Sequence, residues 1–208
     1  MINRSGQRNI FYAFRHGETP WNRERRLQGH SEVSITKEGE EQAKSVIPFL
    51  KKAGVNFLIS SDLLRAKQTA AIVSSELGLE MTFDTRLREV FLGQGQGKLI
   101  EEVDAYFGKS FWKRWSDFGP IYDDLRFPGG ESKRDVDERI RSFLDSHAEL
   151  FQDRVVALCT HGFVMTRMLN ILRPEIKEIW HIQNGECIEL EAKATERKSF
   201  PSSGIDRN

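Results

Sequence analysis

The chain has 208 residues, of which 38% are hydrophobic and 30% charged, and these proportions suit one α/β domain with a sizeable core. Lysine plus arginine and aspartate plus glutamate are equal at 31 each, so the formal net charge is zero. A neutral chain lacks the global field that draws proteins to nucleic acid or to acidic membranes. Any anion site must therefore be local.

The N-terminal residues and the lengths of the apolar runs indicate where the protein is expected to be located. Its first residues, MINRSGQRNI, lack the apolar core of a signal peptide, and no apolar run is long enough to span a bilayer. We expect a cytoplasmic protein with neither a membrane nor a nucleic acid as partner. Cys159 lies inside an apolar run, and with Cys187 it is expected to be a thiol rather than part of a disulfide or metal site.

Short apolar runs that end in polar or glycine-containing turns predict three buried strands. In chain order these are Ile10 to Phe14, Val55 to Ser60 and Val155 to Cys159. Strands that alternate with helices are typical of an α/β fold. We therefore predict a mostly parallel central sheet with helices on both faces.

Three amphipathic patterns predict the helices that separate or follow these strands. The first runs from the N-cap Thr36 to about Gly54, and the second follows Asp62 and stops at Gly78. The third starts at Ser132 and carries an apolar stripe as far as Phe151. A single domain over residues 1–193 is expected, followed by a flexible tail at 194–208.

Two of the predicted strands end in the same dipeptide. His16-Gly17 follows the first strand and His161-Gly162 follows the last. Ligands of open α/β sheets bind beyond the carboxyl ends of the strands, so His16 and His161 are expected to meet there. An isolated His-Gly pair is often only a turn, and His30, His147 and His181 are interpreted as lying outside the site.

Two arginines occur beside these strand ends. Arg15 immediately precedes His16, and Arg65 lies in the first turn of the second predicted helix, near the positive end of its dipole. Planar guanidinium groups match phosphate oxygens, so the cluster predicts a site for a dianion. Zinc on His16, His161 and Cys159 is a weaker interpretation, because no H-x-x-x-H or C-x-x-C pattern supports it.

The motifs at these positions resemble those of the histidine phosphatase superfamily, in its phosphoglycerate mutase-like branch. The resemblance spans roughly residues 9 to 192 and rests on FRHGETPWN, LQGHSEVSITKEGEEQA, SSDLLRAKQTA, LREVFLG, FPGGES and CTHG. It implies that His16 is the nucleophile that becomes phosphorylated. It also implies a phosphate pocket of Arg15, Arg65 and a protonated His161, with Glu89 as proton donor.

Further contacts follow from the same resemblance. Asn22 is implied as a phosphate contact, Gln28 and Gly29 as substrate contacts in the first loop, and Gly162 as part of the pocket. The implied activity is hydrolysis of a small phosphomonoester without cofactor or metal. The alternatives are a phosphoglycerate mutase-type phosphotransferase and a non-catalytic domain that binds phospho-ligands.

The segment after Glu89 favours the phosphatase. It reaches FPGGES after about forty residues and lacks the Arg-Arg pair of the cofactor-dependent mutases. Gly93 to Gly97 departs from the family pattern, so the substrate stays open among sugar phosphates, phosphoglycerate, nucleoside or ribazole phosphates and phosphorylated amino acids. Residues 98–130 are interpreted as a cap or as ordinary core, with apolar contacts at Phe107, Phe111, Trp112 and Trp115. A monomer and a homodimer are both compatible with the sequence.

Overall fold

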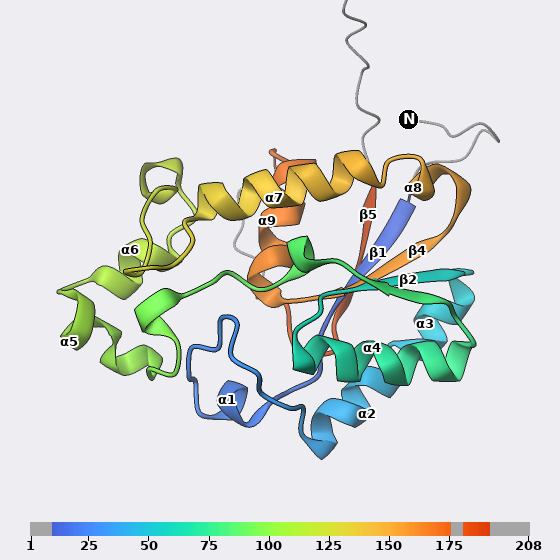
Figure 1. The fold of residues 1–208 in the computed structure, drawn as a ribbon, viewed down its shortest axis with the longest axis horizontal. Helices are drawn as coiled ribbons and strands as arrows, with labels where there is room; N and C mark the ends of the chain where they lie inside the picture. Colours follow the sequence, from blue (N-terminus) through green and yellow to red (C-terminus); the bar gives the residue numbers. More distant parts are fainter. Residues whose placement is uncertain (1–9, 176–180, 192–208) are drawn as a thin grey trace, which may run out of the picture.

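The computed structural model describes residues 10–175 and 181–191, which form one central sheet with helices on both faces (Figure 1). The sheet has five strands in the order β3-β2-β4-β1-β5. The strands are β1 (Ile10–Arg15), β2 (Phe57–Ser60), β3 (Met81–Phe83), β4 (Val156–Thr160) and β5 (Cys187–Glu191). Neighbouring strands pair in parallel except β5, which pairs antiparallel to β1. The predicted fold class is confirmed.

Strand register brings the predicted site residues to one edge of the sheet. Arg15 pairs with Thr160 at the end of β1 and β4, and Ser60 pairs with Cys159 at the end of β2. The His16 amide continues the ladder by donating to the Thr160 carbonyl at 3.0 Å. His16, Ser61 and His161 therefore leave neighbouring strands at the same level.

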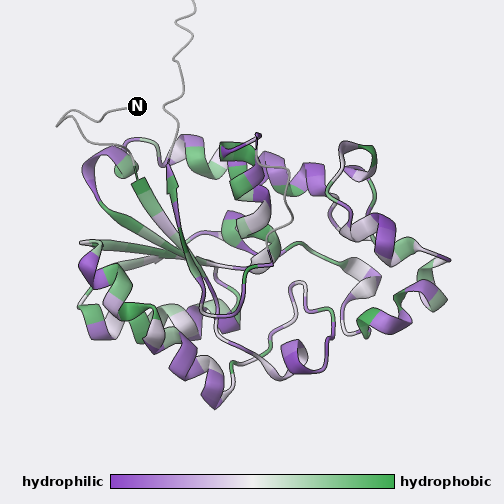
Figure 2. Cartoon of the chain, turned by 180° about the vertical axis from the view of Figure 1, so that it is seen from behind, coloured by the Kyte–Doolittle hydropathy of each residue, from purple (hydrophilic) through white to green (hydrophobic). Residues whose placement is uncertain are grey.

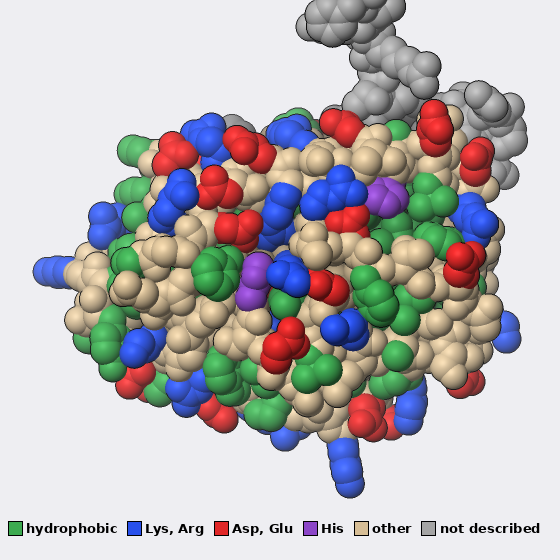
Figure 3. Space-filling model, viewed as in Figure 1, with side chains coloured by type: hydrophobic (Ala, Val, Ile, Leu, Met, Phe, Trp, Pro, Cys, Tyr) green, Lys and Arg blue, Asp and Glu red, His purple; other side chains and the backbone are tan. Residues whose placement is uncertain are grey.

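Two apolar layers hold this sheet, because alternate residues of each strand face opposite sides. In β1, Phe11 and Ala13 join the cluster that includes α7 and α9, whereas Tyr12 and Phe14 join the cluster on α3 and α4. Figure 2 shows the strands as mostly hydrophobic and the outer faces of the helices as mostly hydrophilic. On the face seen in Figure 3, acidic and basic side chains are interspersed, as the zero net charge suggests.

The helices have the following bounds. They are α1 (Pro20–Arg23), α2 (Lys37–Ser45), α3 (Ile47–Lys52), α4 (Leu64–Leu77), α5 (Val103–Phe107), α6 (Phe111–Ser116), α7 (Lys133–Ser146), α8 (Leu150–Asp153) and α9 (Gly162–Leu172). Short 3-10 turns occur at Thr85–Leu87, Gly93–Gly95, Ile100–Glu102 and Pro120–Tyr122. The tail predicted for 194–208 lies outside the described residues.

Two of the three predicted helices differ from the structure. The single helix expected from Thr36 is two, because Pro48 has no N–H to donate and its ring conflicts with the carbonyl four residues earlier. The apolar stripe through Val46 and Ile47 nevertheless continues across the break. The helix that starts at Ser132 ends at Ser146, so Phe151 belongs to the separate helix α8.

Residues 98–130 form short helices beyond the carboxyl ends of the parallel strands, at the left of Figure 1 with α1. Phe111 and Trp115 are buried in the same cluster as Phe127, and Phe107 and Trp112 pack against it. These four apolar side chains are therefore part of the core, which is one of the two interpretations of the sequence. Closure of this segment over the site stays a prediction.

Candidate active site

His16 is held in one orientation and one tautomer at the end of β1. Its side chain is buried, with only 2% of the residue exposed. Nδ1 lies 2.8 Å from the Gly17 carbonyl oxygen, which can only accept, so Nδ1 carries the proton. Nε2 then carries the lone pair and accepts from Arg65 Nε at 3.2 Å. Burial and the two nearby guanidiniums keep the pKa of His16 well below its usual value, so the ring is neutral.

His161 stands beside His16 at the start of α9, with the two ring centroids 5.1 Å apart. Its Nε2 lies 2.8 Å from the Ser61 hydroxyl oxygen. Its buried Nδ1 has no hydrogen-bond partner among the described residues. Burial, with the charge of Arg65 adding to it, lowers the pKa of His161 well below its usual value. The expectation of a protonated His161 concerns the site with a phosphate group bound, and it stays a prediction.

The two arginines reach the site from different elements. Arg65, in the first turn of α4, is 1% exposed, and it donates from Nη2 to the Gly29 carbonyl at 2.8 Å and from Nη1 to the Ser31 carbonyl at 3.1 Å. Arg15 donates from Nη1 to the Ile182 carbonyl at 2.7 Å, while its buried Nε has no partner within the described ranges. Burial lowers the pKa of both guanidiniums, that of Arg65 to about 10, so Arg65 stays charged at neutral pH.

Two glycines allow close packing beside the arginines. A Cβ on Gly162 would lie 3.3 Å from Arg15 Nε, so this position lets α9 begin directly over the guanidinium. Gly29 has a positive φ of 51°, and a Cβ there would lie 2.3 Å from Gln96 Oε1. The tight turn at Gly29 is what aims its carbonyl at Arg65.

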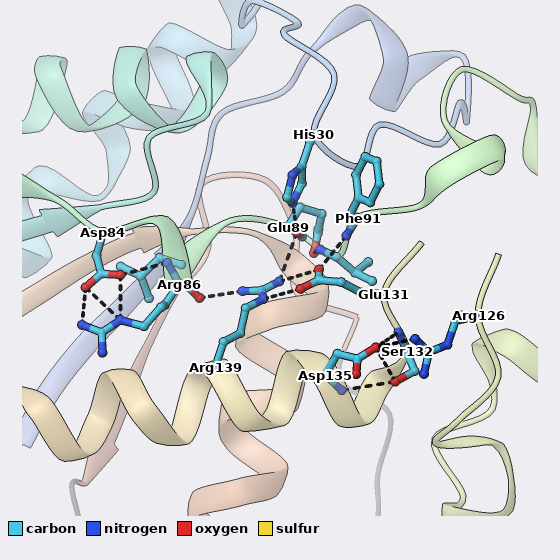
Figure 4. A network of polar contacts seen from close by, with 12 residues as sticks. His30, Asp84, Arg86, Glu89, Phe91, Arg126, Glu131, Ser132, Asp135 and Arg139 are labelled. Atoms are coloured by element: carbon cyan, nitrogen blue, oxygen red, sulfur yellow. Dashed lines mark hydrogen bonds and ion pairs between the residues drawn. The ribbon is translucent and has the colours of Figure 1, made fainter. Parts of the chain in front are cut away.

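Glu89 lies off the sheet, on the segment that follows β3. Its Oε1 accepts from the Val90 amide at 3.0 Å. Burial raises the pKa of its carboxyl, although the charge of Arg65 opposes the shift. Figure 4 shows the backbone of this residue between His30 on one side and Arg139 on the other. His30 Nε2 lies 2.7 Å from the Glu89 carbonyl oxygen, and Arg139 Nη2 donates to the same oxygen at 3.1 Å.

Asn22 and Gln28, whose side chains are predicted to contact the substrate, differ in their hydrogen bonds. Asn22 Oδ1 accepts from the amide and the hydroxyl of Thr19, each at 3.0 Å, and so caps α1. Gln28 is buried, and its Oε1 has no hydrogen-bond partner in the described part of the chain. Contacts of both residues with a substrate stay predictions.

The sequence analysis missed several residues that hold the site together. Ser61 binds His161, Thr69 accepts from the Gly17 amide at 3.0 Å, and Asn184 donates to the His16 carbonyl at 2.9 Å. Ser61 follows β2 directly, so the rule that places ligands at strand ends could have found it. His30 was interpreted as lying outside the site; its ring contacts the backbone carbonyl of Glu89.

Metal and membrane features can be stated only for the residues that the structure describes. Within 10–175 and 181–191, no group of three or more His, Cys, Asp or Glu side chains is arranged to hold a metal ion. No helix there is long and apolar enough to cross a bilayer. The cytoplasmic location stays a prediction of the sequence.

Two histidines, two arginines and a carboxyl with raised pKa form one site at the end of an α/β sheet. This arrangement fits a protein that binds phosphate groups. Residues 11–199 match the histidine phosphatase superfamily (branch 1), and the chain belongs to that superfamily. The resemblance seen in the motifs is thereby confirmed.

The similar proteins include some named as phosphoglycerate mutases and some named as phosphatases. A probable phosphoglycerate mutase, GpmB of Salmonella paratyphi B, is 39% identical over 154 residues, which cover 74% of this chain and 70% of that protein. A mycobacterial glucosyl-3-phosphoglycerate phosphatase solved with VO3 has a TM-score of 0.71 and 30% identity, over 79% of this chain and 82% of its own. YhfR of Bacillus stearothermophilus has a TM-score of 0.72 and 28% identity, over 83% of each chain.

Proposed function

We propose that this chain is a phosphomonoesterase that hydrolyses a small phosphorylated metabolite through a phosphohistidine formed on His16, without a metal ion. The observation that carries the proposal is the setting of the His16 ring. Its Nδ1 donates a hydrogen bond to the Gly17 carbonyl, which leaves the lone pair on Nε2. Nε2 lies 3.2 Å from Arg65 Nε. A nucleophilic nitrogen is thus placed beside a cation that matches phosphate oxygens.

In the first step, Nε2 of His16 forms a bond to phosphorus while the bond from phosphorus to the ester oxygen breaks. Arg15 and Arg65 stabilise the charge that spreads over the nonbridging oxygens. The departing oxygen takes a proton from Glu89, whose raised pKa favours the acid form. A dianion near the unpartnered Nδ1 of His161 would also raise the pKa of that ring and allow it to donate.

In the second step, water attacks the phosphohistidine and the nitrogen to phosphorus bond breaks. Glu89, now a carboxylate, accepts the proton of the water, and inorganic phosphate leaves. The charge stabilisation that a metal ion supplies in many phosphatases is assigned here to the two guanidiniums. The proposed partner is therefore the phosphorylated substrate alone, and a homodimer stays a prediction.

A phosphoglycerate mutase-type phosphotransferase is the second candidate, favoured by the similarity to the protein from Salmonella paratyphi B. It would need a bisphosphate to prime the enzyme, and its product would keep the phosphate. A non-catalytic phospho-ligand domain is less favoured, because Arg15, His16, Arg65, Glu89 and His161 are all present.

The test is a screen of the purified protein for phosphate released from phosphorylated metabolites, with and without chelator. Glucosyl-3-phosphoglycerate and 3-phosphoglycerate head the panel because the named relatives suggest them. Activity should survive chelation, and an alkaline quench should trap acid-labile phosphate on the native protein but none on a folded His16→Ala variant. Phosphate found on a serine or aspartate, or turnover restored only by zinc or magnesium, would contradict the proposal. Isomerised phosphoglycerate without phosphate release would favour the mutase.

A further inference from the structure

The segment that carries Glu89 has no sheet neighbour among the described strands, and side chains from two other elements fix it instead. Arg139, two turns into α7, donates from Nη1 to the Arg86 carbonyl at 2.5 Å and from Nη2 to the Glu89 carbonyl at 3.1 Å. The guanidinium of Arg139 thus binds the carbonyls of both Arg86 and Glu89, and so fixes the short segment that ends at Glu89. Figure 4 shows it reaching up from α7 to this segment.

Glu131, just before the start of α7, binds both Arg139 and the segment that follows Glu89. Its carboxylate accepts from Arg139 Nε at 2.9 Å and from the Phe91 amide at 2.8 Å. The backbone amide of Glu131 also donates to the Phe91 carbonyl at 2.7 Å. The ion pair is largely enclosed, with side-chain exposures of 16% for Arg139 and 24% for Glu131. Enclosed charge-assisted bonds of this kind fix geometry more firmly than exposed ion pairs do.

His30 binds the same carbonyl from the opposite side. Its Nε2 lies 2.7 Å from the Glu89 oxygen, which can only accept, so Nε2 carries a proton. His30 follows Gly29 and precedes Ser31, whose carbonyls hold Arg65. One loop therefore contacts both a phosphate-binding arginine and the residue that bears the acid.

We propose that His30 and Arg139, with Glu131 fixing Arg139, are positioning residues that hold the carboxyl of Glu89 within reach of the leaving-group oxygen. The proposal rests on the function proposed above, in which Glu89 is the acid. His30 and Arg139 bind the backbone carbonyl of Glu89, so their loss should affect proton donation and leave phosphate binding intact.

The test compares an alkyl phosphate with p-nitrophenyl phosphate, whose phenolate leaves without a proton. Arg139→Lys keeps the positive charge but cannot bridge two carbonyls and a carboxylate at once. It should lower kcat/KM for the alkyl phosphate about 10- to 100-fold, the order expected for a misplacement of about 1 Å. The kcat/KM for p-nitrophenyl phosphate should stay near that of the unaltered enzyme, because it reports formation of the phosphoenzyme and not the later hydrolysis in which Glu89 is the base.

His30 offers a graded pair of variants in case Arg139→Lys does not fold. His30→Ala removes the donor, whereas the amide of His30→Gln can still donate to the Glu89 carbonyl. The Ala variant should show the same selective loss and the Gln variant should recover part of it. Arg134→Lys is the matched control, because Arg134 lies on α7 in an exposed ion pair with Asp124 and should leave both rates unchanged.

The double variant with Glu89→Gln identifies the route of the effect. If Arg139 acts only through Glu89, Arg139→Lys should cause no further loss with the alkyl phosphate once the acid is gone. Equal losses with both substrates, additive losses in the double variant, or unchanged activity of Arg139→Lys and His30→Ala would overturn the positioning roles while Glu89 kept its own. Equal losses with both substrates for Glu89→Gln alone would overturn the acid and the positioning roles together.

Discussion

The phosphate-binding half of the site and the acid-bearing half are built in different ways. His16, Arg65 and His161 leave strands or the first turns of helices that the sheet places at one edge. Glu89 lies on a segment outside the sheet, and its backbone is fixed by His30 and Arg139. Groups at strand ends derive their geometry from the core, whereas Glu89 depends on a few long-range side-chain contacts. The two halves should therefore respond differently to substitution.

The largest difference is expected from Glu89→Gln, which keeps the shape of the side chain and removes the proton. An alkoxide is strongly basic and needs that proton to depart, whereas p-nitrophenolate does not. The loss in kcat/KM should reach about 10²- to 10⁴-fold for an alkyl phosphate and be much smaller for p-nitrophenyl phosphate. Single-turnover formation of the phosphoenzyme is the quantity to compare.

Equal losses for both leaving groups would contradict the role of Glu89. Glu18 would then be the next carboxylate to test. In the structure, however, Glu18 pairs with Arg23 at 2.6 Å and accepts from the Thr36 hydroxyl at 3.1 Å. Those contacts tie its carboxylate to Arg23 and Thr36.

Arg65→Lys tests the phosphate-binding half and should affect both substrates alike. Arg65 uses three nitrogens, toward Gly29, Ser31 and His16, and a lysine cannot occupy all of these directions. Burial already lowers the pKa of Arg65 to about 10, and the same burial would bring that of a lysine closer to neutrality. We expect a loss of about 10- to 1,000-fold with either substrate. An unchanged rate would place Arg65 outside the pocket.

The pH dependence of the two halves should also separate. Burial lowers the pKa of His16 and raises that of Glu89, so both shifts favour the active form with neutral imidazole and protonated carboxyl. At the ordinary values of 6.5 and 4.5, the acid would lose its proton before the histidine lost its own. We expect kcat/KM for both substrates to fall only well below pH 6.5, as His16 gains a proton.

Above the raised pKa of Glu89, the rate with the alkyl phosphate should fall relative to that with p-nitrophenyl phosphate. The ratio of the two rates cancels groups that act on both substrates, and so it reports Glu89 alone. Glu89→Gln should remove the pH dependence of that ratio. A ratio that stays constant with pH in the native protein would count against a titrating acid.

Sequence reasoning succeeded where a local pattern determines the structure. The apolar runs before His16 and His161 predicted two strands of a mostly parallel sheet, and the structure pairs them as neighbours. The rule for strand ends predicted that the two rings would meet, and their centroids lie 5.1 Å apart. It failed where distant contacts decide. The strand β5 is short and carries two glutamates, so no apolar run marks it. The support of Glu89 by Arg139, fifty positions away, produces no periodic signal. Pro48 was visible in the sequence, but the apolar stripe across it obscured the break between α2 and α3.

The smallest expected effect concerns how the segment at 98–130 is anchored. The buried Lys133, at the start of α7, donates from Nζ to the Asp117 carbonyl at 2.5 Å and to the Tyr122 carbonyl at 3.3 Å. Burial, with the charge of Arg167 adding to it, lowers the pKa of Lys133 from 10.5 to about 8. Since the hydrogen bonds of Lys133 go to this segment and not to the site residues, Lys133→Met should leave the rate with p-nitrophenyl phosphate near the native value.

Stability should reveal Lys133 more clearly than activity does. Between about pH 8 and 10.5 the unfolded chain keeps the proton on this lysine while the folded protein has lost it, so the group makes the free energy of unfolding rise with pH there. We expect denaturant unfolding to show that the free energy of unfolding rises more between pH 8 and pH 10 for the native protein than for Lys133→Met. Lys52→Met, at an exposed position in α3, is the control and should follow the native protein. Parallel curves for the native protein and Lys133→Met would mean that burial in the folded protein does not shift the titration of this lysine.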